Sequence, residues 1–178
     1  PTDVITLDGR AWQDTDTRFA FAFDPKRFDD PKAFCDAVHD LDMRLCVWEY
    51  PLVSVRGNLF GELERKGWLL KDGSGKAAKY EFDTEPFGKV LTPLPESGLI
   101  DLTHPQAYAW WRDEHAKLFE TGVDIIKPDF GEQVTDDMIA HDGSSGPELH
   151  NAYALLYNRC VFEATEAAFG AGEALVFS

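Results

Sequence analysis

The residues best suited to chemistry lie in one short stretch, Lys127-Pro128-Asp129-Phe130-Gly131-Glu132. It holds two carboxylates, Asp129 and Glu132, and the cation of Lys127 would favour the charged form of Asp129. A carboxylate held rigidly at one place can act as a nucleophile or exchange protons with a ligand. The plainer alternative is an acid at a strand end that caps the next segment or pairs with Lys127.

The segment before these residues must position them. Apolar residues at 123, 125 and 126 leave little room for a solvated face, so Val123–Asp129 is expected to form a parallel strand buried on both faces. Because side chains alternate along a strand, Lys127 and Asp129 should share one face. Pro128 has no N–H, so the regular strand should end there. In α/β folds this carboxyl end is where ligands and chemistry are found.

The rest of the chain alternates between strand and helix patterns. Gly9–Trp12, after the first strand, is expected to be a loop. The helices should begin at Asp29-Asp30-Pro31, Asn58, Thr103-His104-Pro105 and Leu149, with Gly67 and Gly170 as stops for the second and fourth. The third of them should carry Leu118. Besides the strand at 123–129, strands are expected at Val4–Asp8, Arg44–Pro51, Leu99–Leu102 and Ala174–Ser178.

This alternation predicts an α/β fold with roughly five parallel strands and right-handed crossovers. Two architectures fit: an open doubly wound sheet, or part of a (β/α)8 barrel. A full barrel needs roughly 200 to 250 residues, and about half of its strands can be assigned here. Because the chain ends on a strand, we expect the native barrel to continue past Ser178.

Residues 68–98 differ from the rest and are expected to form an insertion that contains a hairpin. Lys71-Asp72-Gly73-Ser74-Gly75 is a strong turn signal. Long insertions in a compact domain are uncommon unless they are functional. The residues 1–178 are otherwise interpreted as a single segment without a linker.

The composition excludes several classes of partner. The formal net charge of −15, with no basic cluster, argues against a nucleic acid and against an anionic membrane surface. No stretch approaches the ~20 apolar residues of a membrane span. Three widely spaced cysteines, Cys35, Cys46 and Cys160, do not suggest a disulfide framework and fit a cytoplasmic location.

Two other kinds of site are disfavoured. A metal cluster could be imagined around His141, Asp142 and His150, with Asp136 and Asp137, but no H-x-H or H-E-x-x-H spacing is present. Asp129-Phe130-Gly131 also spells the metal-binding triplet of kinases, but the chain has neither H-R-D nor a glycine-rich phosphate loop. No metal and no cofactor are expected.

Several ordered motifs resemble glycoside hydrolase family 31. Lys127–Glu132 resembles the nucleophile motif of that family in the K-x-D-F-G-E form, which is closest to the bacterial α-xylosidase branch. The other motifs lie at compatible spacing over nearly the whole chain and resemble the F-P-D-P, W-I-x-P, D-F-T-N-P and H-N-x-Y motifs of the family. They are Phe28–Pro31, Val47–Pro51, Ile100–Pro105 and His150–Tyr153.

The resemblance implies a segment of a catalytic (β/α)8 barrel that begins near its second strand and cleaves α-linked sugars with retention of configuration. Asp129 would be the nucleophile, and Asp8 and Trp48 would contact the sugar in the −1 subsite. Lys127 would be a further substrate contact, and Glu132 would support the loop. The acid/base aspartate of the family would lie beyond Ser178. An α-xyloside is the favoured substrate, followed by an α-glucoside.

Other interpretations remain open at this point. Asp8 could form a turn, Trp48 could pack the barrel, and Lys127 could make only a structural ion pair. Trp110 and Trp111 are interpreted as core residues; Tyr80, Phe82 and Phe87 either line an outer sugar subsite or pack the insertion. The whole chain could be a non-catalytic carbohydrate-binding or inert barrel fragment, or an unrelated open-sheet hydrolase. Exposed barrel edges would favour a homo-oligomer.

Overall fold

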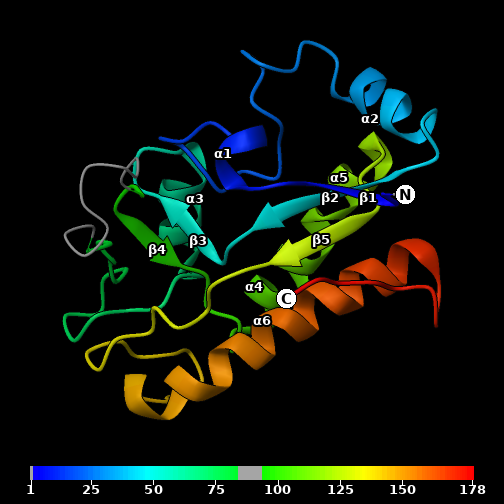
Figure 1. The fold of residues 1–178 in the computed structure, drawn as a ribbon. Helices are drawn as coiled ribbons and strands as arrows, with labels where there is room; N and C mark the ends of the chain where they lie inside the picture. Colours follow the sequence, from blue (N-terminus) through cyan, green and yellow to red (C-terminus); the bar gives the residue numbers. More distant parts are fainter. Residues whose placement is uncertain (1, 84–93) are drawn as a thin grey trace.

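A parallel sheet of three strands forms the centre of the fold (Figure 1). This computed structural model describes residues 2–83 and 94–178. The strands are β1 (Val4–Leu7), β2 (Arg44–Glu49) and β5 (Ile125–Pro128), in the order β1-β2-β5. The register pairs Thr6 with Cys46 and Trp48 with Lys127. As expected, the last strand ends at Pro128.

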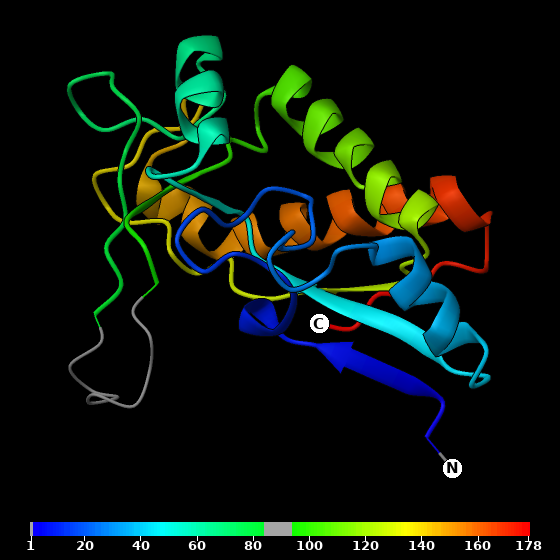
Figure 2. The same cartoon turned by 90° about the horizontal axis from the view of Figure 1, so that it is seen from above.

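The helices form a layer on one face of this sheet (Figure 2). Helix α2 packs on β2, the long helix α6 packs on β5, and α5 contacts both α2 and α6. Leu45, Val47 and Ile126 point into this layer and are completely buried. The opposite face carries Thr6, Trp48 and Lys127, because side chains in register point to the same side. The helices of this layer are α2 (Pro31–His39), α4 (Pro105–Glu114), α5 (Ala116–Thr121) and α6 (Gly146–Phe169).

Local sequence signals explain most helix ends. The Asp30 side chain accepts a hydrogen bond from the N–H of Ala33 at 3.0 Å, with Pro31 in the first turn of α2. Ser145 and Glu148 form a capping box at the start of α6. Helix α3 (Asn58–Lys66) ends at Gly67 in the left-handed conformation, but its N-cap is Gly57 rather than Asn58.

Two helical expectations need correction. Gly9–Trp12 is not a loop but a single helical turn, α1, because the Asp8 carboxylate caps it by accepting the N–H of Gly9. The helix after Pro105 does not run on to Leu118; it breaks at His115, which ends α4 and precedes α5. The interpretation of the tryptophans is confirmed for Trp111, which is fully buried, whereas Trp110 is half-buried against the core.

The expected strand at Leu99–Leu102 is not part of the parallel sheet. Strand β4 (Ser97–Leu99) pairs antiparallel with β3 (Leu52–Ser54), and isolated bridges join Leu69 to Ile100 and Lys71 to Ala77. The prediction was wrong because a short apolar run gives burial but not strand direction. Everything between β2 and β5 is therefore one long connection, with antiparallel pairing that starts before residue 68.

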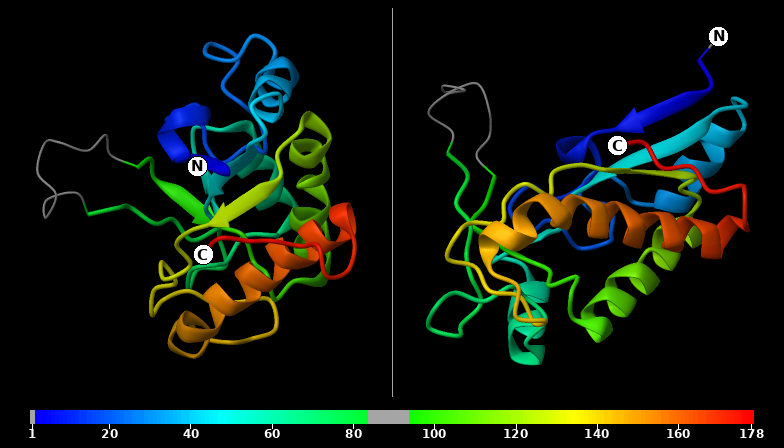
Figure 3. Two further views of the ribbon diagram at one scale, coloured as in Figure 1. Left: turned by 45° about the vertical axis from the view of Figure 1, so that its right-hand side comes forward. Right: turned by 90° about the horizontal axis from the view of Figure 1, so that it is seen from below.

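The expected strand at Ala174–Ser178 is reduced to one contact. Val176 forms a parallel bridge with Ile126, and the N–H of Phe177 donates to the Ile126 carbonyl at 3.1 Å. The C-terminal segment runs back from α6 along β5 (Figure 3). The order β1, β2, β5, Val176 follows the chain, which is the progression of a barrel wall. In the described residues, three of the five expected parallel strands are thus complete.

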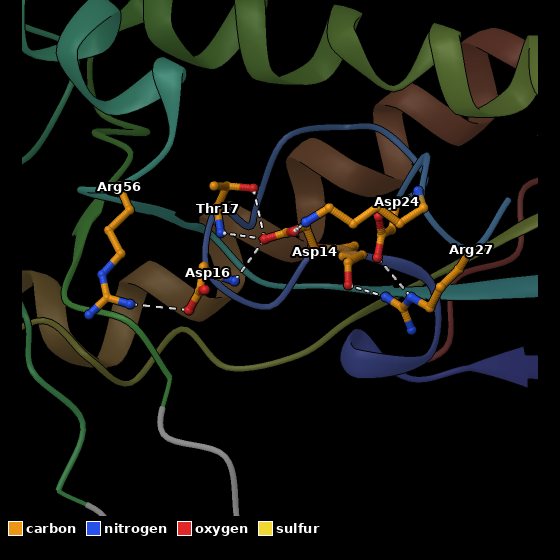
Figure 4. Close-up of polar contacts among 8 residues, drawn as sticks. Asp14, Asp16, Thr17, Asp24, Arg27 and Arg56 are labelled. Atoms are coloured by element: carbon orange, nitrogen blue, oxygen red, sulfur yellow. Dashed lines mark hydrogen bonds and ion pairs between the residues drawn. The ribbon is translucent and has the colours of Figure 1, made fainter. Parts of the chain in front are cut away.

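The loop between β1 and α2 is held by charged contacts (Figure 4). The Asp14 carboxylate accepts hydrogen bonds from the N–H groups of Asp16 and Thr17 at 2.9 and 3.1 Å. Arg27 donates to Asp24 at 2.8 Å, and Arg56 reaches Asp16 at 3.1 Å from the segment after β3. These contacts fix the loop that follows Asp8 and α1.

A buried ionic group joins the sheet to the helix layer. Glu49, the last residue of β2, and His115, between α4 and α5, are both 0% exposed, with Oε2 and Nε2 2.7 Å apart. The Tyr157 hydroxyl of α6 donates to Oε1 at 2.7 Å. Burial alone would lower the pKa of His115, but the charge and hydrogen bond of Glu49 outweigh it and raise that pKa above 6.5. Contact with Glu49 therefore favours the protonated form of His115.

This pair predicts a pH-dependent stability. Because the folded-state pKa of His115 is raised, its contribution is complete below about pH 6.5 and is lost as the pH rises through the folded value. Relative to the uncharged double variant Glu49→Gln/His115→Gln, the wild type should lose stability from pH 6.5 upward. Thermal unfolding midpoints of both proteins across this range would test it. A difference that stays constant with pH would contradict the assignment.

Candidate functional site

Four predicted site residues meet at one edge of the parallel sheet. Asp8 follows β1, Trp48 lies near the end of β2, Lys127 lies in β5, and Asp129 follows β5. Since β1, β2 and β5 run parallel and are adjacent, their carboxyl ends come together at this edge. Strand alternation then turns the four side chains to the face opposite the helices.

Asp129 is held on both of its carboxylate oxygens. The indole Nε1 of Trp48 donates to Oδ2 at 2.8 Å, and the Nζ of Lys127 lies 3.4 Å from the same oxygen. Oδ1 accepts the N–H of Phe130 at 3.1 Å, and the N–H of Asp129 itself donates to the carbonyl of Glu49 at 2.9 Å. With its side chain still 43% exposed, this carboxylate is both fixed and accessible to a ligand.

Lys127 links the two acids of the site. Its Nζ lies 3.1 Å from Asp8 Oδ2 as well as 3.4 Å from Asp129 Oδ2. Partial burial alone would lower the pKa of Lys127, but the hydrogen bond to Asp8 and the charge of Asp129 raise it above 10.5. Lys127 therefore remains a cation in the physiological range. Asp8, at 71% exposed, keeps room to accept a hydroxyl from a ligand.

Trp48 is held by the helical turn α1 and by the residue that follows it. Its carbonyl oxygen accepts hydrogen bonds from Trp12 Nε1 at 3.0 Å and from Gln13 Nε2 at 3.1 Å. Its ring lies against Gly9, where an added Cβ would come within 2.7 Å of Cε3. The Trp48 side chain is almost fully buried in this chain, so it presents its N–H edge to Asp129 while its faces pack. This burial supports the packing role, and the role of Trp48 as a substrate contact stays a prediction.

An aromatic cluster extends the site toward the long connection. Phe130, at φ 67°, places its ring 5.9 Å from Trp48, 5.8 Å from Tyr50 and 5.7 Å from Phe82. Tyr80 lies 4.9 Å from Phe82. Of the aromatic residues expected in the insertion, Tyr80 and Phe82 therefore join the cluster around Phe130, whereas Phe87 lies outside the described residues. Burial raises the pKa of Tyr50 to about 12, so its hydroxyl stays protonated.

The loop after Asp129 is supported by Gln133 rather than by Glu132. The Gln133 side chain is buried and accepts the N–H of Gly131 at 3.0 Å. Glu132 is exposed, and no hydrogen bond or ion pair joins it to the part of the chain that the structure describes. Sequence reasoning missed Gln133, Tyr50 and Phe130; the last two lie inside the motifs already singled out.

The acids and histidines after Asp129 do not gather around a common point. Within residues 2–83 and 94–178, no group of three or more His, Cys, Asp or Glu is arranged to hold a metal ion. His141 instead packs against His104, with ring centroids 4.1 Å apart, and His150 bonds to the Val134 carbonyl. In the same ranges, no helix has the length and hydrophobicity needed to cross a bilayer.

By fold and site, this is an α/β domain with a carboxylate centre at the carboxyl edge of its parallel strands. Comparison with known families matches residues 1–178 to the TIM-barrel domain of the glycosyl hydrolases family 31. The chain belongs to glycoside hydrolase family 31.

Characterised relatives support this assignment. The α-xylosidase XylQ of Lactiplantibacillus pentosus is 34% identical over 179 aligned positions, which cover 100% of this chain and 22% of that protein. The sulfoquinovosidase of Escherichia coli (strain K12) is 36% identical over 128 positions, 71% of this chain and 17% of that protein. The chain thus spans about a fifth of the length of these curated relatives.

Solved structures agree on the fold. A family 31 α-xylosidase from a soil metagenome, complexed with xylose, superposes with a TM-score of 0.76 at 24% identity. The match covers 99% of this chain and 25% of that one. A family 31 sulfoquinovosidase from E. rectale, in complex with an aza-sugar inhibitor, gives a TM-score of 0.76 at 21% identity, over 89% and 23% of the two chains.

The contact between Gly9 and Trp48 gives a test of the site geometry. Replacing Gly9 with Ala should destabilise the protein by roughly 1–3 kcal/mol, because the new Cβ must displace the indole. The matched control is Gly61→Ala in α3, where the nearest atom, on Arg65, is 3.6 Å away and Ala should be neutral or stabilising by up to about 1 kcal/mol. Equal thermal shifts for the two variants would contradict this packing.

Proposed function

We propose that this chain carries the nucleophile of a retaining α-glycosidase, and that Asp129 is that nucleophile. The observation that carries the proposal is the Asp129 carboxylate, fixed by Trp48 and Lys127 yet open to a ligand. It lies at the edge where barrel enzymes place their chemistry. Membership of family 31 supplies the reaction class, which the geometry of one carboxylate alone would not define.

The reaction would proceed by double displacement. An oxygen of Asp129 forms a bond to the anomeric carbon while the bond to the leaving oxygen breaks, and an acid outside this chain protonates that oxygen. Water, deprotonated by the same group, then attacks the anomeric carbon and releases Asp129. The N–H of Trp48 and the cation of Lys127 hold the Asp129 carboxylate in one orientation for the first step.

Asp8, Trp48 and Lys127 would then bind the sugar beside Asp129. Asp8 is the most exposed of the group and can accept hydroxyl hydrogen bonds, while Lys127 can donate one. Phe82 and Phe130, which pack against the buried Tyr50, offer apolar surface next to this position. A terminal sugar unit is the ligand that these groups fit best.

Among α-linked sugars, an α-xyloside is the first choice and an α-glucoside the second. The α-xylosidase XylQ is similar over the whole of this chain, and a second α-xylosidase, from Emericella nidulans, is 30% identical over 89% of it. The K-x-D-F-G-E form of Lys127–Glu132 points the same way. Because one relative is a sulfoquinovosidase, a sulfonated sugar is the substrate to compare with the α-xyloside.

The test uses the protein at its native length. Incubation with 5-fluoro α-xylosyl fluoride should add one glycosyl group, detected by intact mass and mapped by peptide mass spectrometry to Asp129. Asp129→Asn should lose roughly 10³-fold or more in kcat with little change in unfolding midpoint. The matched control is Asp42→Asn, an exposed acid in the turn before the amino end of β2, which should keep wild-type kcat.

The outcomes separate the alternatives. Retained turnover in Asp129→Asn would refute the nucleophile assignment. An adduct with an α-glucosyl or sulfonated analogue but not with the α-xylosyl reagent would keep the mechanism and change the substrate. The absence of turnover and adduct with every sugar would favour a carbohydrate-binding role without catalysis.

A further inference from the structure

The buried group of Glu49, His115 and Tyr157 lies directly behind the candidate nucleophile. Trp48 and Glu49 are consecutive in β2, so their side chains point to opposite faces of the sheet. Trp48 turns toward Asp129 and donates to its Oδ2, while Glu49 turns into the helix layer. The carbonyl of Glu49 accepts the N–H of Asp129 at 2.9 Å. One residue is therefore bonded to the helices by its side chain and to Asp129 by its backbone.

Regular pairing of the sheet ends at this point. The last residues of β2 and β5 are Glu49 and Pro128, which are partners in the register, and the N–H of Asp129 just beyond them donates to the Glu49 carbonyl. The strand tip that carries Trp48 and meets Asp129 gains its further restraint from side-chain contacts.

The side chain of Glu49 supplies that restraint through contacts with two parts of the helix layer. Its Oε1 accepts from Tyr157 of α6, and its Oε2 contacts Nε2 of His115 at the junction of α4 and α5. The other ring nitrogen of His115, Nδ1, lies 2.8 Å from the carbonyl of Trp111, so it must donate and the orientation of the ring is fixed. Burial raises the pKa of Tyr157 well above 10, so its hydroxyl remains a donor.

Stability alone does not account for these residues. Removing two charges from water is costly, and apolar residues of similar volume often stabilise a core as well as a buried ion pair does. Apolar packing does not fix the orientation of a group as hydrogen bonds do, whereas a catalytic group must be held within about 0.5 Å of its working position. The cluster lies where a fixed orientation is needed, because Glu49 directly follows Trp48 in the chain.

We propose that Glu49, His115 and Tyr157 form a positioning clamp that fixes the tip of β2 and, through Trp48 and the Glu49 carbonyl, the carboxylate of Asp129. These three are positioning residues and do not touch the substrate. The inference rests on the proposed role of Asp129, but it assigns function to residues outside the sugar site. Loss of the clamp should lower the rate of the chemical steps and leave sugar binding in the ground state nearly unchanged.

Two variants test the clamp in the native-length enzyme. Tyr157→Phe removes a single hydroxyl and should lower kcat by about threefold or more. The triple variant Glu49→Leu/His115→Leu/Tyr157→Phe replaces the cluster with apolar groups. It should lower kcat by about 10- to 100-fold, because even a small misplacement of a catalytic group costs a rate factor of this size. In both variants, KM and the inhibition constant of the product sugar should stay within about twofold of wild type.

The matched control is His39→Gln. His39, the last residue of α2, also pairs with a carboxylate: its Nε2 lies 2.9 Å from Oδ2 of Asp124, which accepts the N–H of Leu45 in β2 at 2.7 Å. This pair lies at the amino ends of β2 and β5, away from Asp129. Its loss should lower the unfolding midpoint and leave kcat unchanged, which shows what a purely structural defect does.

Asp129→Asn, measured alongside, distinguishes failure of the clamp from failure of the proposed function. If Asp129→Asn is inactive while Tyr157→Phe and the triple variant keep wild-type kcat, the clamp is refuted and the nucleophile stands. If the triple variant does not fold, Tyr157→Phe decides alone. A loss of kcat that His39→Gln matches at equal destabilisation would also overturn the proposal.

Discussion

Parallel pairing of β2 with both β1 and β5 is the interaction on which the rest of the molecule depends. It sets the register that places Trp48 beside Lys127 and brings the carboxyl ends of three strands to one edge. A shift by one residue would exchange the two faces of β2, sending Trp48 into the helices and Glu49 into the site. The complete burial of Leu45, Val47 and Ile126 against the helix layer makes that shift very costly.

The charges of the site follow from this pairing. One lysine lies between two acids, so the group of Asp8, Lys127 and Asp129 carries a net charge of about −1 when both acids are ionised. Glycoside hydrolysis passes through an oxocarbenium-like transition state, in which positive charge develops at the anomeric carbon. In the proposed reaction, the surplus negative charge would lie beside that carbon and complement such a state.

The sequence allowed the grouping of the candidate site residues to be predicted better than the fold around them. Asp8, Trp48, Lys127 and Asp129 could be placed together because each lies at or next to a strand end, and such ends meet in a parallel sheet. The direction of β4 could not, because the apolar run at Leu99 reads the same in either orientation. The clamp could not be predicted either, because Glu49 contacts His115 and Tyr157 across separations of 66 and 108 residues in the sequence. Only the assembled fold brings such residues together.

The long connection between β2 and β5 has a consequence for how such a domain can diversify. Its two ends are fixed by neighbouring strands of one sheet, and its antiparallel part pairs with itself through β3 and β4. The side chains of Tyr50 and Phe82 bring it to Phe130, next to Asp129. The antiparallel part of this connection, which does not include His115, can therefore vary while the strands that carry Trp48 and Asp129 keep their register. The surface beside the site and the strands that carry its carboxylate are thus built into separable parts of one chain.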